Sequence, residues 1–165
     1  MPLLNGLEHP MQHLFGASAF TAFQLSKLQS ASGMEGLQSA EVFFVDTQAA
    51  LTDTDRARLG QLLQEAPPPF DRAPDFIVTP RVGTLSPWSS KATEIFQVCA
   101  LHAVKRVERG IAFWTSQTTT SAQRRHVCDP MTQTILDTLE DARHLFGTAD
   151  PSPVIYRTLG DNPTE

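Results

Sequence analysis

The sequence predicts an α+β fold, with one sheet of about three to five strands and helices packed on one face. Two observations support this. Stretches with helical spacing of apolar residues alternate with a few short runs rich in β-branched and aromatic residues. The length of 165 residues suits one domain that buries roughly two-thirds of its unfolded surface.

The first part of the chain contains a leader, a helix and a strand. Residues 1–15 show no periodicity and are expected to form a loosely ordered leader. The spacing of Phe20, Phe23 and Leu28 predicts a short helix that ends near Gly33. Residues 41–47 are β-branched and aromatic between polar neighbours, which predicts a strand buried on at least one face.

The middle of the chain repeats this alternation. The acidic residues after Thr52 suit a helix N-terminus, and the leucines that follow predict a helix stopped by the prolines at 67–69. Residues 76–78 predict a central strand. Ser86 before Pro87 reads as an N-cap with proline at the first helical position. This opens the most amphipathic helix of the chain, whose expected apolar face carries Ala92, Ile95, Phe96, Cys99 and Ala100.

The last part is expected to contain a long strand and a long helix. Residues 104–115 read as a strand whose phase slips, and a bulge near residues 108–110 explains the slip. Residues 121–146 have a helical pattern, with a kink or break forced by Pro130. Residues 151–165 are proline-rich, include one possible short strand at 154–156, and are expected to form a linker.

Composition narrows the class of protein. The formal net charge is −5, which argues against general nucleic-acid binding. No apolar run approaches the ~20 residues of a membrane span, and no secretory signal is visible. Two cysteines do not make a disulfide framework, so we expect a reduced, cytosolic protein without membrane or nucleic-acid partners.

General catalytic motifs do not emerge. The sequence has no glycine-rich phosphate loop, no H-E-x-x-H and no C-x-x-C. His9 and His13 are four residues apart, but without a helical pattern we expect no metal site there. Cys128 is near His126, yet residues two apart on a helix do not face each other, so an activated thiol is disfavoured. Cys99 is expected in the core.

Residues 79–91 are the most informative stretch. Hydroxyl and cationic side chains surround a predicted helix N-terminus, which suits a phosphate or carboxylate. Trp88 adds a large apolar residue of the kind found at interface hot spots. A well-capped helix with a solvated lysine and a core tryptophan explains the same residues equally well. The anion-binding interpretation involves Arg81, Ser86, Ser89, Ser90 and Lys91.

A second candidate group lies on the predicted strand. Arg106, Glu108 and Arg109 place three charges in an otherwise apolar segment, and buried charges need partners. They either pair with each other or with groups of another domain. An edge strand with solvated charges is the alternative, which we favour less.

Both stretches resemble a specific family. Residues 78–95 read V-T-P-R-V-G-T-L-S-P-W-S-S-K-A-T-E-I, and residues 104–113 contain R-V-E-R-G. Both are similar in sequence and order to the N-terminal domain of large-type phosphoribosylformylglycinamidine synthase, also called FGAM synthase, FGAR amidotransferase or, in bacteria, PurL. Segments at 19–28, 46–63 and 141–146 are similar in kind and order, so the resemblance covers roughly residues 16–160. Pro130 departs from the family pattern.

The resemblance implies a non-catalytic part of a larger ligase. The family enzyme converts formylglycinamide ribonucleotide, glutamine and ATP to formylglycinamidine ribonucleotide, with magnesium, in purine biosynthesis. Its synthetase domain and its glutaminase domain, which carries a Cys-His-Glu triad, have no counterpart here; Cys99 and Cys128 do not match the nucleophile. Residues 16–150 are then a PurS-like, antiparallel-rich sandwich. It bridges the two other domains and itself binds no cofactor or metal.

The resemblance also leads us to expect which residues contact the synthetase and glutaminase domains. Ten candidate residues face the neighbouring domains or lock that face through ion pairs: Arg81, Thr84, Ser86, Trp88, Ser89, Ser90, Lys91, Arg106, Glu108 and Arg109. Two alternatives remain open. The chain is a separate adaptor that assembles synthetase and glutaminase subunits, or it is a small module that binds a phosphate ligand at residues 86–91.

Overall fold

The computed structural model describes residues 11–81 and 83–146, and it confirms the α+β fold. A five-stranded sheet runs in the order β1-β2-β4-β3-β5, and every neighbouring pair is antiparallel. The strands are β1 Gln12–Phe15, β2 Gln38–Thr47, β3 Phe76–Pro80, β4 Val104–Trp114 and β5 Gln133–Leu136. The helices are α2 Ala22–Ser32, α3 Asp53–Leu63, α4 Pro87–Val98, α5 Ser121–Arg124, and the 3-10 helices η1 Arg125–Val127 and η2 Leu139–Leu145.

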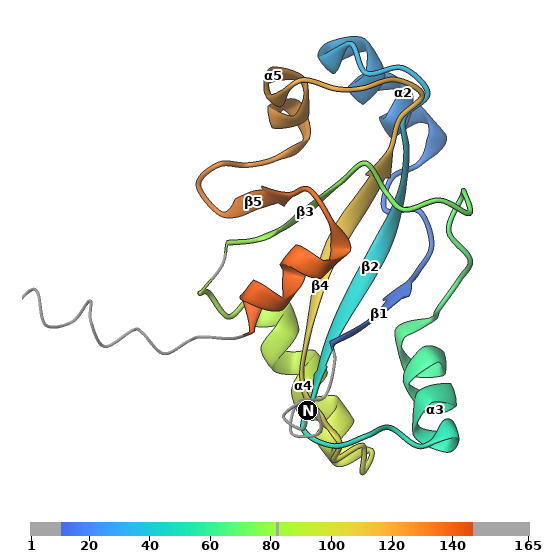
Figure 1. Ribbon diagram of the computed structural model, residues 1–165, viewed down its shortest axis with the longest axis vertical. Coiled ribbons are helices and arrows are strands. Elements are labelled where there is room, and N and C mark those ends of the chain that lie inside the picture. The colour runs from blue at the N-terminus through green and yellow to red at the C-terminus, as the bar shows by residue number, and fades with distance from the viewer. Residues whose placement is uncertain (1–10, 82, 147–165) are drawn as a thin grey trace, which may run out of the picture.

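The α-helices cover one face of the sheet, as predicted. The long strands β2 and β4 form its centre (Figure 1). Phe43 and Val107 point toward α3 and α4 and form a core cluster with Leu59 and Phe96. A second cluster on the same face packs Leu25 of α2 against β3 and β4. Burial of these side chains, roughly 1.5–3 kcal/mol each, holds the helices on this face.

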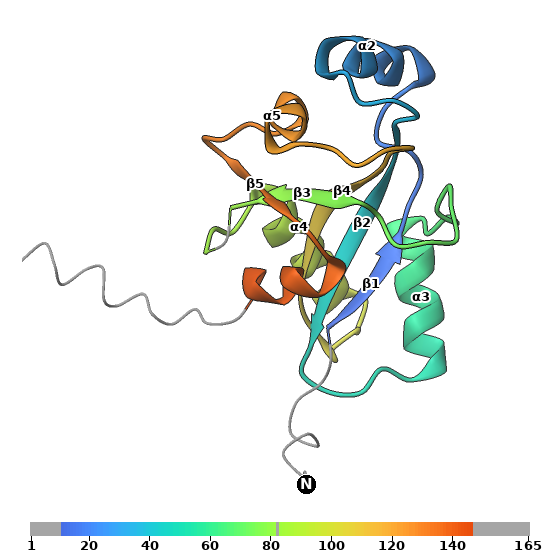
Figure 2. The ribbon, with the colours of Figure 1, turned by 45° about the horizontal axis from the view of Figure 1, so that its top comes forward.

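The opposite face is covered by η2, a short helix that the sequence pattern did not predict. In Figure 2 this short helix crosses in front of the strands, while α4 lies behind them. Ala142 and Leu145 of η2 pack against Val42, Phe44 and Trp114. The sheet is therefore apolar on both faces, which agrees with the nearly continuous apolar sequence of β2.

The predicted helix starts are confirmed at α3 and α4. The Thr52 hydroxyl accepts the N–H of Asp55 at 3.0 Å, and the Ser86 hydroxyl accepts that of Ser89 at 3.0 Å. Pro87 occupies the start of α4. Helix α3 ends before the prolines, because Gln64 adopts a left-handed conformation with φ 58°.

The prediction of a long helix over residues 121–146 is wrong. The segment forms α5, η1, β5 and η2 instead. Thr120 and Thr138 each cap a separate helical turn. Between them, β5 pairs with β3, and the adjacent Ile135 and Leu136 pack on opposite faces of the sheet. These two neighbouring apolar residues, which the helical pattern assigned to one stripe, thus belong to a strand that packs on both faces of the sheet.

The bulge is also at a different place than expected. Residues 108–110 pair regularly with β2, whereas the register shifts where Asp46 and Thr47 face Arg106 and Val104. Lys105 is the extra residue. This insertion places both Val104 and Val107 in the same core cluster although they are three residues apart, which explains the phase slip in the sequence.

Three smaller expectations also need correction. Part of the expected leader is ordered, since residues 12–15 form edge strand β1 with Leu14 in the core. Cys99 is half-buried rather than in the core, because α4 ends there and Ala100 turns into a left-handed conformation. Ile95 and Ala100, expected on the buried face, are exposed. Residues 1–10, Val82 and residues 147–165, with the expected linker, lie outside the described part.

Candidate functional site

The start of α4 is tied to β4 by its serine hydroxyls. Ser86 caps the helix and also donates to Glu108 Oε2 at 2.8 Å. Ser89 is fully buried; its hydroxyl donates to the Val107 carbonyl at 2.5 Å and accepts from Arg106 Nε at 3.2 Å. Both hydroxyls therefore have their partners within the domain and hold the helix N-terminus against the sheet.

Glu108 is the centre of this polar network. Its side chain is only 1% exposed, and its carboxylate accepts hydrogen bonds from Arg106 Nη2 at 3.1 Å, Ser86 Oγ at 2.8 Å and the Arg109 N–H at 3.0 Å. Three donors satisfy a buried carboxylate that otherwise would be strongly destabilising. Of the interpretations of this charged segment, pairing of Arg106 with Glu108 is confirmed.

Arg106 links four segments of the chain. Besides Glu108 and Ser89, its guanidinium donates to the carbonyls of Thr84 at 2.9 Å and Leu145 at 3.1 Å, and it lies over the Phe146 ring at 5.2 Å. The loop before α4, the helix itself, β4 and η2 thus share one cation. The network fixes these segments relative to one another.

Trp88 and Arg109 form the outward part of this region. Trp88 is half-buried and stacks on Phe43 at 5.8 Å between ring centroids. The Arg109 guanidinium lies over the indole at 4.8 Å, and its Nη1 is 3.8 Å from Glu41 Oε2. With Ser86, Glu108 and others, these side chains line a pocket of 430 Å³. We call the surface formed by Trp88, Arg109 and Glu41 the Trp88 surface.

The remaining sequence candidates are not all drawn together. Arg81 turns away from the start of α4 and donates to the Pro130 carbonyl at 2.7 Å. The Thr84 hydroxyl bonds the Arg81 carbonyl at 2.7 Å and closes a tight turn. Ser90 and Lys91 are exposed on α4.

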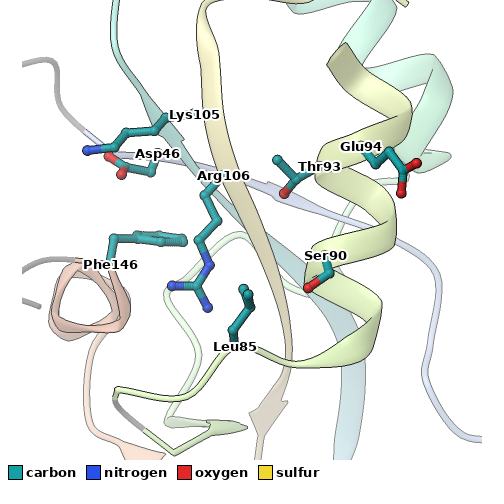
Figure 3. A pocket seen from close by; sticks show the side chains of 8 residues that line it. All are labelled: Asp46, Leu85, Ser90, Thr93, Glu94, Lys105, Arg106 and Phe146. Carbon is teal, nitrogen blue, oxygen red and sulfur yellow. The ribbon is translucent and has the colours of Figure 1, made fainter. Parts of the chain in front are cut away.

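Another pocket, of 490 Å³, lies between α4, β4 and η2 (Figure 3). Ser90 and Arg106 line it, together with Asp46, Lys105 and Phe146, which the sequence analysis did not single out. Burial raises the pKa of Asp46, and the nearby cations Lys105 and Arg106 partly oppose that rise. Lys105 lines this pocket because it is the bulged residue of β4. The phase slip in the sequence of this strand is the local signal of that bulge.

The thiol next to the short helix η1 is not activated. Burial, and secondarily Asp129, raise the pKa of Cys128, which keeps the sulfur protonated rather than nucleophilic. Within residues 11–81 and 83–146, no three His, Cys, Asp or Glu side chains are placed to hold a metal ion. No helix in those ranges is long and apolar enough to span a membrane.

Most of the described chain matches a known protein family. The family model described as formylglycinamide ribonucleotide amidotransferase N-terminal matches residues 40–146, which span β2 to η2 and contain every candidate residue. The match covers well over half of the chain. The protein therefore belongs to the N-terminal domain family of formylglycinamide ribonucleotide amidotransferase, an enzyme of purine biosynthesis.

Proposed function

We propose that this chain is the non-catalytic domain that bridges the synthetase and glutaminase parts of the amidotransferase. In the overall reaction, formylglycinamide ribonucleotide, glutamine and ATP yield formylglycinamidine ribonucleotide in the cytoplasm. ATP and magnesium bind in the other parts, and this chain contributes contacts rather than reacting groups. The resemblance of residues 78–95 and 104–113 to the family enzyme supports this assignment.

The Trp88 surface is the observation that carries the proposal. Tryptophan and arginine are enriched at interface hot spots, and here they stack on one another beside a pocket. The Arg109 side chain is 43% exposed, so it remains available to a partner. Beneath it, the Glu108 network makes the surface rigid, which reduces the ordering that binding requires.

The proposal predicts a selective defect. Trp88→Ala in the complete amidotransferase weakens glutamine-dependent synthesis more than ammonia-dependent synthesis, because only the former needs both active sites coupled. Arg109→Glu, which removes no core packing, shows the same selectivity. Phe23→Ala, an aromatic residue 69% exposed on α2, is the matched control and changes neither activity.

Equal loss of both activities in Trp88→Ala and Arg109→Glu, or no loss in either, contradicts the coupling role.

A separate adaptor is the second candidate, because PurS-like proteins in split systems work as free subunits. The two are distinguished by the mass of the native polypeptide in its own cells, detected with an antibody against these residues. A band far above 18.2 kDa indicates a domain of a larger chain, and a band at 18.2 kDa an adaptor.

A further inference from the structure

A third pocket, next to the one that the Trp88 surface lines, concentrates positive charge. It measures 390 Å³ and lies where the loop after β3 meets α5, η1 and β5. Three arginines line it, with Asp137 as the one carboxylate among its lining residues. The sequence places Arg81 some forty residues from Arg124 and Arg125, so only the fold brings them together.

The protein holds two of these guanidinium groups in place. Arg81 Nη1 donates to the Pro130 carbonyl, a neutral acceptor, at 2.7 Å. The Arg124 side chain is 22% exposed; its Nε donates to Thr119 Oγ1 at 2.8 Å and its Nη1 to Asp137 Oδ1 at 3.1 Å. Its guanidinium also lies over the Phe76 ring at 4.9 Å. Each therefore has a fixed position and further N–H groups with no protein acceptor among the described residues.

Arg125 completes the group. Its side chain is exposed and makes no hydrogen bond or ion pair within the described part of the chain. Asp137 is 81% exposed and engages Arg124 alone. Asp129 lies on the neighbouring turn, where its carboxylate oxygens accept from the Met131 N–H and the Thr132 hydroxyl; these neutral donors leave its negative charge in place beside Cys128.

The net positive charge of the pocket lining favours binding of an anion. Three guanidinium groups and the Asp137 carboxylate leave two net positive charges among the lining residues, and the Asp129 carboxylate beside Cys128 offsets one of them, within a chain whose formal net charge is −5. Like charges gathered in a concave site repel one another, and a bound anion removes that repulsion. The raised pKa of the Cys128 thiol, which also lines the pocket, keeps the sulfur neutral.

We propose that this pocket binds the phosphate group of a small phosphate monoester through Arg81, Arg124 and Arg125. The planar guanidinium fork matches phosphate oxygens in pairs, and the net positive charge of the pocket favours an anionic phosphate group. The volume lies within the roughly 300–1,000 Å³ of small-molecule sites and leaves room beyond the phosphate for a sugar. Ser121, Gln133 and Thr134 add hydroxyl and amide groups to the pocket lining. The pocket shares Gln133 with the pocket beside the Trp88 surface, but its three arginines are not part of that surface, and the proposal does not depend on the bridging role.

Calorimetric titration of the 165-residue chain tests this site, with ribose 5-phosphate, inorganic phosphate and ribose as probes. We expect saturable binding of one ribose 5-phosphate per chain, binding of inorganic phosphate that is no tighter, and no binding of ribose. Arg125→Gln weakens ribose 5-phosphate binding roughly tenfold, because one charge-assisted contact is lost. Its thermal unfolding temperature does not fall, since this side chain has no partner in the described structure and its removal relieves repulsion from the other two arginines. Arg81→Gln shows a similar loss of binding.

Lys91→Gln is the matched control, because it removes an exposed cation at the start of α4, outside the pocket. We expect its affinity to stay within about twofold of the original chain. Three results overturn the proposal: no saturable binding of either phosphate probe, ribose binding as tightly as ribose 5-phosphate, or equal weakening by Lys91→Gln and Arg125→Gln. The last of these assigns the binding to general charge attraction or to the helix start.

Discussion

Replacing Glu108 by alanine tests the energetic role of the polar network beneath the Trp88 surface. The carboxylate is 1% exposed and satisfies three donors, which lose their acceptor in Glu108→Ala. Removing one partner of a buried ion pair costs about 3–5 kcal/mol. Arg106 is 21% exposed and keeps its bonds to Ser89, Thr84 and Leu145, so water replaces part of the loss. We therefore expect destabilisation near the lower end, about 3 kcal/mol.

Urea and thermal denaturation followed by circular dichroism measure this effect. For a protein of this length, about 3 kcal/mol lowers Tm by roughly 6–12 °C. Glu94→Ala is the matched control, since Glu94 is exposed on α4 and makes no ion pair among the described residues; it should change stability by no more than about 0.5 kcal/mol. If Glu108→Ala costs less than about 1 kcal/mol, the network does not hold α4 and η2 to the sheet as described.

Two further variants test local geometry. Burial raises the pKa of Asp46, so the folded protein is favoured when this carboxyl is protonated, and that stability is lost as pH rises through the raised pKa. Asp46→Asn, which is neutral at every pH, should therefore be more stable than the original protein near pH 7. The gain should shrink as pH falls toward 4. A pH-independent difference in Tm would rule out titration of this carboxyl as the cause. Gly110→Ala puts a Cβ 2.9 Å from the Val78 carbonyl oxygen, and the forced shift of two paired strands should cost about 1–3 kcal/mol in urea denaturation. Unchanged stability would show that β3 and β4 separate at this point without cost.

Short-range features of the sequence were enough to predict the start of helix α4 and the strand β2. Ser86 and Pro87 mark the start of α4 because an N-cap and a proline at the first turn act within four residues. The β-branched and aromatic run of β2 likewise identifies a buried strand. The alternation of these elements was enough to predict the fold class, and the long string around Trp88 was enough to indicate the family.

Long-range pairing explains what the sequence did not predict. Ile135 and Leu136 have no local feature that distinguishes a strand from a helix; pairing with β3 decides between them. The position of the bulge depends in the same way on the partner strand β2. In the candidate site, the contact of Ser86 with Glu108 spans 22 residues of sequence. The meeting of Arg81 with Arg124 follows from β3 and β5 lying side by side, and therefore had no signal in either stretch alone.

Hydrogen exchange at the Trp88 surface tests the bridging role most directly. The comparison is between the 165-residue chain by itself and the complete amidotransferase, whether its other parts lie on the same chain or on separate subunits. The bridging account predicts that backbone amides around Trp88 and Arg109 exchange more slowly in the complete enzyme, while those of the exposed helix α2 near Phe23 are unchanged. Equal exchange around Trp88 and Arg109 in both samples would contradict it, because a surface that contacts no other part of the enzyme cannot couple its two active sites.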